Sequence, residues 1–571
     1  MIMIFFHRMI LNDTRRLLVG TLVMILLVST YSTSAYAASD YCSTAAINLN
    51  KLSAAGELQY KIQCEGLDVE SAGFVSGDGF VSPESIQSVG PNTKITADPA
   101  GPSGIPNTQS EVSLDSCGNS VVVGYNDAQG FFATSSFSGY SYSLDNGLTW
   151  TDAGVLPTPP GGFSFGDPSV KADSNCDFYY ATLTSVGGDS GIGVAKSTNG
   201  GVTFGAPVIV ASTLTNFLDK ELIAVGPNPA GGQDIIHISY TEFTISGAAA
   251  IVYARSLDGG VTWQDFNTLN PGGSSQGSIP VADPSTGDVY VFYQDFAAGT
   301  IKAFKNTNGG APGFWQAGVD VSPLNFAGTF NAFCGRPVWN GDHRINQFPT
   351  AGVNPVNGDV YVAWNNGAFN GDPTTDIVFF RSTDGGTTWL GPISPHPALA
   401  TTDQFEPWMD VAPDGEIKMI WYDRRDDPSS NLDTDVFASS SNDGGQTWQP
   451  NVKVTTTPFT MGVLTPYQDP LIVPCYFVGE YIGIDVPNIS FAHAAWGDGR
   501  ILTTDGIPQP DVFYSKLIQK VNEVVGGEFL PVDSTALVLA GIQTSSVWIL
   551  SIFGLVAGVT FATLFFKVKR I

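Results

Sequence analysis

Basic residues are scarce in this chain of 571 residues, which has 25 lysines and arginines against 53 aspartates and glutamates. The formal net charge is −28, and a surface of that sign repels the phosphate backbone of nucleic acids. We therefore expect no nucleic-acid partner. Such acidity suits a surface exposed to salt, and its carboxylates make calcium the one candidate cofactor.

Cysteine is rare as well, and no two of the six cysteines are spaced as CxxC. That spacing is common in thiolate metal sites, so its absence argues against one. In a chain exported to an oxidising compartment, six cysteines are better explained as three disulfides. The spacing alone leaves their pairing open.

The N-terminus has the pattern of an export signal. Basic residues, the last of them Arg15 and Arg16, precede an apolar run at residues 17–28, and an Ala-Tyr-Ala cleavage site ends at Ala37. We expect residues 1–37 to be a signal peptide. Two adjacent arginines also fit a twin-arginine signal, so the export route stays open.

A second apolar run, at residues 547–566, contains no charged residue and is followed by Lys567, Lys569 and Arg570. A helix of about twenty residues spans roughly 30 Å, the thickness of a bilayer core. The positive-inside rule leaves the tail at 567–571 in the cytoplasm and everything before residue 547 outside. These features predict a single-pass cell-membrane protein with a large extracellular part and a stalk at 521–546.

A polar turn of eight residues recurs along the chain. SLDGGVTW begins at Ser256, and SLDNGLTW, STNGGVTF, STDGGTTW and SNDGGQTW begin at Ser143, Ser197, Ser382 and Ser441. In such a turn an Asp or Asn side chain bonds the backbone a few residues on, and glycines take positive φ angles. We therefore predict a structural role for the third residue of each copy: Asp145, Asn199, Asp258, Asp384 and Asp443.

The same succession of short strands precedes each turn. Seven such units, 53 to 75 residues apart, align on these residues of their second strands: Tyr125, Thr182, Tyr240, Tyr293, Trp364, Trp421 and Trp496. A period of this size with four strands per unit is typical of a propeller blade. We predict an all-β, seven-bladed β-propeller over residues 91–520, preceded by an extension at 38–90. Six blades is the alternative if one unit has been divided in two.

Two of the seven units, the fourth and the seventh, lack the turn, and the seventh also lacks its outer strand. The string PNTKITADPAG from Pro91 resembles PNVKVTTTPF from Pro450, which is the fourth strand of the sixth unit. We therefore predict that residues 94–97 supply the outer strand of the last blade. This would close the ring and remove two exposed sheet edges.

The five copies of S-x-D-x-G-x-x-W resemble the Asp-box, or BNR, repeats of sialidase-like β-propellers, over roughly residues 105–520. The resemblance implies the propeller fold. It does not by itself imply an activity, because the motif is also similar to repeats of non-enzymatic propellers such as sortilin-type receptors and photosystem assembly factors. The tail GGEFLPVDSTALVLAG resembles the stalk and anchor of surface proteins from ammonia-oxidising archaea.

In a propeller the repeated turn lies on one face, and ligands usually bind at the channel mouth on the opposite face. Two long insertions between late blades belong to this ligand face, and each carries one cysteine. Two further cysteines occupy equivalent inner turns of adjacent blades, and two remain near the N-terminus. The predicted disulfides are Cys334–Cys475, Cys117–Cys176 and Cys42–Cys64.

Four acidic residues stand at the starts of predicted inner strands, which would place them around the channel mouth: Asp167, Glu221, Glu406 and Glu480. Paired carboxylates in such a place could act as acid and base. They could equally accept hydrogen bonds from backbone amides at the end of the channel.

The loops between second and third strands are longest in the last blades and are highly charged. Arginines in them could bind a carboxylate or phosphate: Arg424, Arg425 and Arg500. Clustered carboxylates in the same loops are candidate calcium ligands: Asp423, Asp426, Asp427 and Asp433. The alternative is a solvated loop whose charges neutralise one another in salt bridges.

Sialidases of the resembled superfamily hold the substrate carboxylate with three arginines and use a tyrosine nucleophile with a glutamate partner and an aspartate acid/base. This sequence lacks the Arg-Ile-Pro stretch that supplies the first arginine, and its nearest string is HRINQFP at Arg344. A triad could still be drawn from Arg344, one of Arg424 and Arg425, and Arg500. All of these belong to late blades.

We therefore favour a membrane-anchored extracellular propeller that binds glycans or other components of the cell envelope. An exo-acting glycoside hydrolase using arginines and carboxylates at the channel mouth is the alternative, and a purely structural envelope role is the third. The string NIS at Asn488 is a glycan acceptor signal in the predicted extracellular part.

Overall fold

The computed structural model describes residues 86–97, 108–325, 328–331, 336–339, 343–367, 374–397, 402–461, 478–502, 506 and 508–519. The chain divides into two compact units, Met1–Ser82 and Pro83–Ile571, and all described residues belong to the second. The predicted signal peptide, stalk and membrane helix lie outside them, as do the pairs Cys42–Cys64 and Cys334–Cys475. Within the described ranges no helix has the length and apolar character needed to cross a bilayer.

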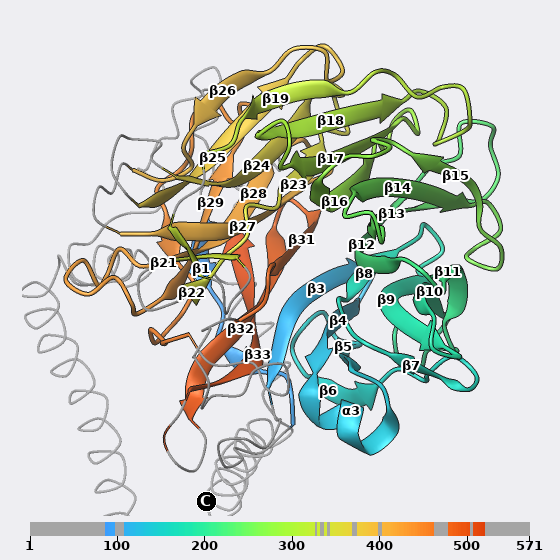
Figure 1. Cartoon of the computed structure of the whole chain (residues 1–571). Coiled ribbons are helices and arrows are strands. Elements are labelled where there is room, and N and C mark those ends of the chain that lie inside the picture. The colour runs from blue at the N-terminus through green and yellow to red at the C-terminus, as the bar shows by residue number, and fades with distance from the viewer. Residues whose placement is uncertain are drawn as a thin grey trace, which may run out of the picture. The chain divides into compact units, whose positions relative to one another are not determined.

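Seven antiparallel sheets follow one another along the described chain, which confirms the seven-bladed propeller (Figure 1). The first blade consists of β3 (Gln109–Cys117), β4 (Ser120–Asp127), β5 (Ser138–Ser143) and β6 (Thr151–Val155), with α3 (Ala128–Thr134) after β4. The second consists of β8 (Ser169–Ala172), β9 (Phe178–Val186), β10 (Ser190–Ser197) and β11 (Val208–Thr213), and β7 (Gly162–Ser164) also pairs with β9. The third consists of β12 (Phe217–Gly226), β13 (Ile235–Phe243), β14 (Ala249–Ser256) and β15 (Gln264–Thr268).

The later blades repeat this order. The fourth consists of β16 (Ser275–Ala282), β17 (Val289–Asp295), β18 (Thr300–Asn306) and β19 (Val319–Pro323), and the fifth of β23 (Thr350–Val353), β24 (Val360–Gly367), β25 (Thr375–Ser382) and β26 (Leu390–Ile393). The insertion between them forms a small sheet of β20 (Thr329–Asn331), β21 (Arg336–Trp339) and β22 (His343–Arg344). The sixth consists of β27 (Gln404–Val411), β28 (Ile417–Asp423), β29 (Asp435–Ser441) and β30 (Val452–Lys453).

The sheets form a ring because their inner strands contact one another in cyclic order, from β3 through β8, β12, β16, β23 and β27 to β31 (Gly483–Asn488) and back to β3. Each of the seven interfaces between neighbouring blades has its own cluster of buried apolar side chains. A sheet that packs on both sides needs apolar residues on both faces, which explains why strands such as VYVAW are almost entirely apolar. Trp364, Trp421 and Trp496 are completely buried in these clusters.

The ring is closed by the first described strands. β2 (Thr93–Lys94) pairs antiparallel with β33 (Pro508–Gln519), and Thr93 lies opposite Tyr514. The seventh blade therefore contains β31, β32 (Phe491–Leu502), β33 and β2. This confirms the prediction that an N-terminal strand completes the last blade. β1 (Ile86–Val89) also pairs with β33, so the blade begins before the predicted boundary at residue 91. Lys94 Nζ lies 2.8 Å from a carboxylate oxygen of Asp511 on β33.

The repeated turn joins the third and fourth strands of a blade and is held by one carboxylate. In the third blade, Asp258 Oδ1 accepts hydrogen bonds from the Ser256 hydroxyl at 2.8 Å and from the Thr262 backbone amide at 2.8 Å. The Thr262 hydroxyl donates to Oδ2 at 2.6 Å. The Gly260 amide donates to Ser256 Oγ at 2.9 Å, and Gly260 has a φ of 84°. The turn thus needs these residues for its own backbone geometry, as the sequence predicts.

The fourth blade retains part of this turn, although the sequence predicts its loss. Asn306 stands in place of the first serine, and its Oδ1 accepts from the amides of Asn308 at 2.9 Å and Gly310 at 3.0 Å. A side-chain amide oxygen therefore replaces the hydroxyl oxygen.

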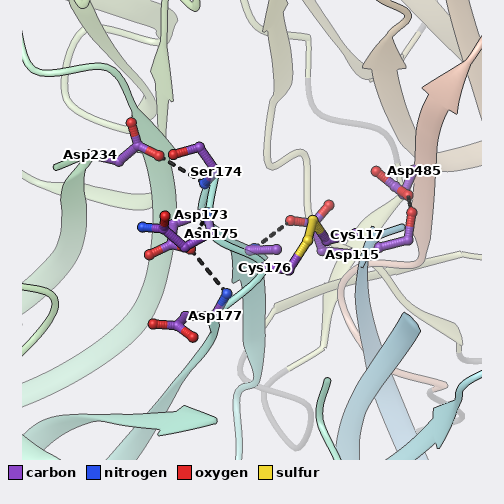
Figure 2. The surroundings of a disulfide bond; sticks show 11 residues. Asp115, Cys117, Asp173, Ser174, Asn175, Cys176, Asp177, Asp234 and Asp485 are labelled. Carbon is purple, nitrogen blue, oxygen red and sulfur yellow. Dashed lines mark hydrogen bonds between the residues drawn. A yellow bond between two sulfur atoms is a disulfide. The ribbon is translucent and has the colours of Figure 1, made fainter. Parts of the chain in front are cut away.

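The disulfide Cys117–Cys176 is present, as predicted, with Cα atoms 5.4 Å apart. Figure 2 shows that it joins the end of β3 in the first blade to the turn before β9 in the second. Asp173 stabilises that turn, because its Oδ1 accepts from the amides of Asn175 at 2.9 Å and Asp177 at 3.0 Å. The disulfide thus links neighbouring blades at the end of the inner strands opposite the ligand face. Asn488, the predicted glycan acceptor, ends β31 with its side chain partly buried.

Candidate functional site

Most inner strands carry a left-handed residue near their first end. The residues with positive φ are Glu111, Asp167, Lys220, Gly277, Glu406 and Gly479, in blades one, two, three, four, six and seven. At four of these places, in β3, β12, β16 and β27, the pairing with the second strand shifts register, which marks a β-bulge. A bulge reorients the side chain that it carries, and a non-glycine residue at positive φ is strained by about 1–3 kcal/mol. The ring accepts this strain at the channel, where several of these side chains meet.

Lys220 lies at the centre of a cluster of carboxylates from three other blades. Its Nζ is 2.8 Å from Glu111 Oε1, 3.2 Å from Asp167 Oδ2 and 2.7 Å from Glu480 Oε2. Only 9% of the Lys220 side chain is exposed. Burial opposes the lysine charge, but Asp167, Glu111 and Glu480 together raise the pKa of Lys220 well above its ordinary value. The ammonium group is therefore a fixed cation that links the third blade to three others.

Glu480 also meets one residue of the small inserted sheet and one that follows it. Arg344 NH2, at the end of β22, lies 2.5 Å from Glu480 Oε1, and Asn346 Nδ2 donates to the same oxygen. Arg344 keeps 25% of its side chain exposed, whereas Glu480 keeps 1%. The insertion between the fourth and fifth blades thus brings a guanidinium group to the Lys220 cluster.

A pocket of about 540 Å³, which we call the mouth pocket, opens beside this cluster. Its charged wall includes Lys220, Arg344 and Glu480, and its other wall includes Phe165 and Phe217. Phe217 is 55% exposed. The mouth pocket therefore combines fixed charges with an accessible aromatic surface.

A second, much smaller space of about 20 Å³ lies deeper in the channel, and we call it the channel neck. Six blades contribute to its lining, which includes Asp167, Glu221, Glu406 and Glu480. The four acidic residues that the sequence places at the channel are therefore all found around it. Asp167, Lys220 and Glu480 line both spaces, so the neck adjoins the mouth pocket.

Burial raises the pKa values of three glutamates at this site well above their ordinary range. For Glu221 the charge of Asp167 adds to burial, and for Glu406 the charge of Glu480 does so. For Glu111 burial and the neighbouring Asp167 carboxyl raise the pKa, against the lowering effect of Lys220. Burial is the largest cause for all three carboxyl groups, and it disfavours their charged form.

Hydrogen bonds between blades fix the backbone at two of the left-handed residues. The Asp167 amide donates to Asn126 Oδ1 at 2.8 Å, and the Glu406 amide donates to Asn365 Oδ1 at 3.2 Å. Both asparagines follow the aromatic residue of a second strand, in YND and WNN. The first blade thus positions a channel residue of the second, and the fifth blade one of the sixth.

The predicted arginine triad is not assembled in the described residues, because three of its four candidates are used elsewhere. Arg425 stacks 4.2 Å from the Phe437 ring and pairs with Asp423 on its own blade at 2.5 Å. Likewise, Arg500 stacks 4.4 Å from the Phe513 ring and pairs with Asp498 at 2.6 Å. These pairs arise from a W-x-D pattern in which the tryptophan also donates to the aspartate. Of the four, only Arg344 lines the mouth pocket.

Arg424, the remaining candidate, is 1% exposed. It donates to the Asn431 carbonyl at 3.0 Å and contacts His343 Nδ1 at 3.2 Å. Its role is to join the sixth blade to the small inserted sheet.

The predicted calcium ligands bind protein groups instead. Asp423 accepts from Trp421 Nε1 at 2.8 Å, and Asp426 pairs with Lys453 at 2.9 Å. Asp427 accepts from the Leu432 amide at 3.0 Å, and Asp433 accepts from the Thr460 hydroxyl at 3.1 Å. Across the described residues no group of three or more histidines, cysteines or acids could hold a metal ion. Asp423 and Asp426 form salt bridges, with Arg425 and Lys453, whereas Asp427 and Asp433 accept hydrogen bonds from backbone and hydroxyl groups.

Lys220, Glu111 and Asn346 belong to the site, although no sequence pattern singles them out. Lys220 directly precedes Glu221 in the string KELI, and that neighbour was the available signal. Side chains of a strand alternate between its two faces, and a bulge shifts this alternation by one residue. Two consecutive residues such as Lys220 and Glu221 can therefore both reach the channel region.

No protein-family model matches the chain, and no curated protein matches it in sequence. Among solved structures, a Dyadobacter fermentans protein of unknown function matches with 14% identity and a TM-score of 0.39, covering 64% of this chain and 97% of its own. A Hadza microbial sialidase matches with 11% identity and a TM-score of 0.37, covering 67% and 73%. An α-L-arabinofuranosidase from Fusarium graminearum matches with 13% identity and a TM-score of 0.38, covering 62% and 92%.

These scores are low, so the seven-bladed architecture rests on the strand pairing of the chain itself. By name, the two matched structures of stated activity are a sialidase and an arabinofuranosidase. They give no support to the resemblance of the tail to archaeal surface proteins.

Proposed function

We propose that the propeller binds glycans in the mouth pocket. The observation that carries this proposal is the composition of the pocket, whose lining combines the charged groups of Lys220, Arg344 and Glu480 with the exposed ring of Phe217. Sugars offer hydroxyl groups for hydrogen bonding and an apolar ring face for stacking, and such a pocket satisfies both. A volume of about 540 Å³ is within the usual range for small-molecule sites.

Glycoside hydrolysis is the second candidate function, and a different observation favours it. Glu111 lies beside Asp167, and burial together with that neighbour raises the pKa of Glu111 well above its ordinary value. A carboxyl group with a raised pKa can act as a general acid. In this candidate mechanism Glu111 gives its proton to the leaving glycosidic oxygen, the bond from that oxygen to the anomeric carbon breaks, and a water molecule attacks the anomeric carbon and releases its proton to solvent.

The glycan proposal is tested by measuring the binding of an oligosaccharide panel to the full chain by isothermal titration calorimetry. We expect Phe217→Ala to weaken binding about tenfold, because one stacked ring contributes about 1–1.5 kcal/mol beyond area burial. Phe266→Ala is the matched control, since Phe266 is similarly exposed on the outer strand β15 and does not line the mouth pocket. Equal binding by both variants would contradict the proposed site.

Release of reducing sugar that is lost in Glu111→Gln would identify a hydrolase.

We also propose that this domain is displayed on the outside of the cell and anchored by residues 547–566, with glycans or other envelope components as partners. The support is the uncharged apolar run and the three basic residues that follow it. We expect the full chain to remain in the membrane fraction after alkaline carbonate extraction. Added protease should cleave it on intact cells. A chain ending at residue 546 should be released, and its retention in the membrane would contradict the anchor.

A further inference from the structure

The channel neck contains buried polar groups that no described residue satisfies. Both carboxyl oxygens of Glu221 and of Glu406, the hydroxyl of Ser278 and the side-chain nitrogen of Asn365 lack a hydrogen-bond partner. All four residues line the neck, and none is more than 4% exposed. Native proteins leave few such groups unpaired, because each costs about 1–3 kcal/mol. The neck is therefore suited to receive a polar group.

The charge around the neck shows which kind of polar group fits. Four acidic residues line it, and Lys220 is the one lysine or arginine among its lining residues. Lys220 is already shared between Asp167 and Glu480 inside the neck and Glu111 outside it. A ligand that brings positive charge would compensate the remaining carboxyl groups, Glu221 and Glu406, whose charged form is disfavoured by burial.

Aromatic rings complete the surroundings. Phe348, Trp408 and Tyr481 line the neck, and the ring centroids of Trp408 and Tyr481 are 5.7 Å apart. Lys220 Nζ lies 5.3 Å from the centroid of the Tyr481 ring, so the protein already holds one ammonium group against this wall. Carboxylates combined with aromatic faces attract ammonium groups by charge and by cation–π interaction.

We propose that the channel neck binds a primary ammonium group, and that the glycan in the mouth pocket is an amino sugar whose charged nitrogen enters the neck. This inference rests on the proposed glycan-binding function. The neck has room for about one water-sized group, which is the size of an ammonium group. An ammonium group has three N–H donors for the unpartnered oxygens, whereas a hydroxyl has one. Asp167, Lys220 and Glu480 line both spaces, so a glycan in the mouth pocket would lie next to the neck.

The test compares four methyl glycosides of the glucose series, namely the glucosaminide, glucoside, N-acetylglucosaminide and glucuronide, by calorimetry on the full chain. We expect the glucosaminide to bind at least about tenfold more tightly than the glucoside, as one charge-assisted hydrogen bond provides. The N-acetyl compound should lose this advantage, and the glucuronide should bind most weakly. Glu221→Gln and Glu406→Gln should each reduce the preference for the amine.

Glu242→Gln is the matched control, because Glu242 pairs with Asn216 outside the neck and should leave the preference unchanged. Binding of the glucoside with no preference for the glucosaminide would overturn the inference and keep the proposed function. If no glycoside binds, the Tm of the full chain in methylammonium chloride is compared with its Tm in sodium chloride. A higher Tm in methylammonium chloride that is lost in Glu221→Gln would support the ammonium site without glycan binding. An unchanged Tm would reject both the ammonium site and the glycan site. Tighter binding of Nα-acetyl-lysine amide, whose side-chain ammonium group is free, than of the glucosaminide would assign the neck to a peptide and overturn the amino-sugar inference.

Discussion

Replacement of Lys220 by methionine should lower the free energy of unfolding by about 3–5 kcal/mol at pH 8. The substitution keeps much of the side-chain volume but leaves Glu111, Asp167 and Glu480 without the cation that lies within 3.2 Å of each. Removal of one partner from a buried ion cluster has this magnitude because the remaining charges stay desolvated. Urea denaturation of the full chain measures the loss.

The loss should shrink as the pH falls. Lys220 lowers the pKa values of Glu111 and Glu406, so its removal raises these pKa values further above those of the unfolded chain. A carboxyl group with a raised folded pKa stabilises the fold at pH values below its unfolded pKa, and this contribution is lost as the pH rises through the folded pKa. The variant should therefore approach the wild type near pH 5. A loss that does not change with pH would contradict the charge cluster.

Lys302→Met is the matched control for this experiment. Lys302 pairs with Asp320, whose side chain is 64% exposed, so the pair is largely hydrated. An exposed pair of this kind contributes about 0–1 kcal/mol. A comparable loss in both variants would mean that lysine removal, and not the channel cluster, determines the result.

Ile95→Pro should destabilise the ring by about 4 kcal/mol or more. The Ile95 amide donates to the Val512 carbonyl at 3.0 Å, and its side chain is 3% exposed in the cluster between the seventh and first blades. Proline removes the amide donor, and the loss of a buried isoleucine side chain adds its own cavity cost. Urea denaturation measures the stability, and hydrogen exchange of β33 amides reports whether the closing strand has detached.

Ile95→Val separates closure from simple loss of volume. It removes one methylene group and keeps the hydrogen bond, so about 1 kcal/mol is expected. Faster exchange of β33 amides should appear in the proline variant alone. If the proline variant retains wild-type stability and exchange, the pairing of β2 with β33 does not close the ring.

The fold could be predicted because each blade repeats the same local chemistry. The turn at Asp258 is held by residues within a few positions of one another, and the anchors Trp364, Trp421 and Trp496 stand at the same place in their strands. Such short-range patterns recur along the chain, with five copies of the turn. The closing strand was predictable for a related reason, since the string around Lys94 resembles the outer strand of the preceding blade.

The site was predictable only in part, because its geometry depends on contacts between blades. Glu221 and Glu406 were found from their places at inner-strand starts. Lys220 was missed because its left-handed backbone, with a φ of 55°, cannot be read from KELI. Arg425 and Arg500 were assigned to the ligand site because sequence spacing does not show that each folds back onto an aspartate two residues before it.

The pairing of Ile86 with Gln519 determines how the ring responds to tension. These residues are direct neighbours at the outer ends of β1 and β33, so a pull applied through both would separate the antiparallel pairs one after another. Such unzipping requires much less force than sliding two strands past each other, where all pairs must break together. The seventh blade is therefore where mechanical failure should begin.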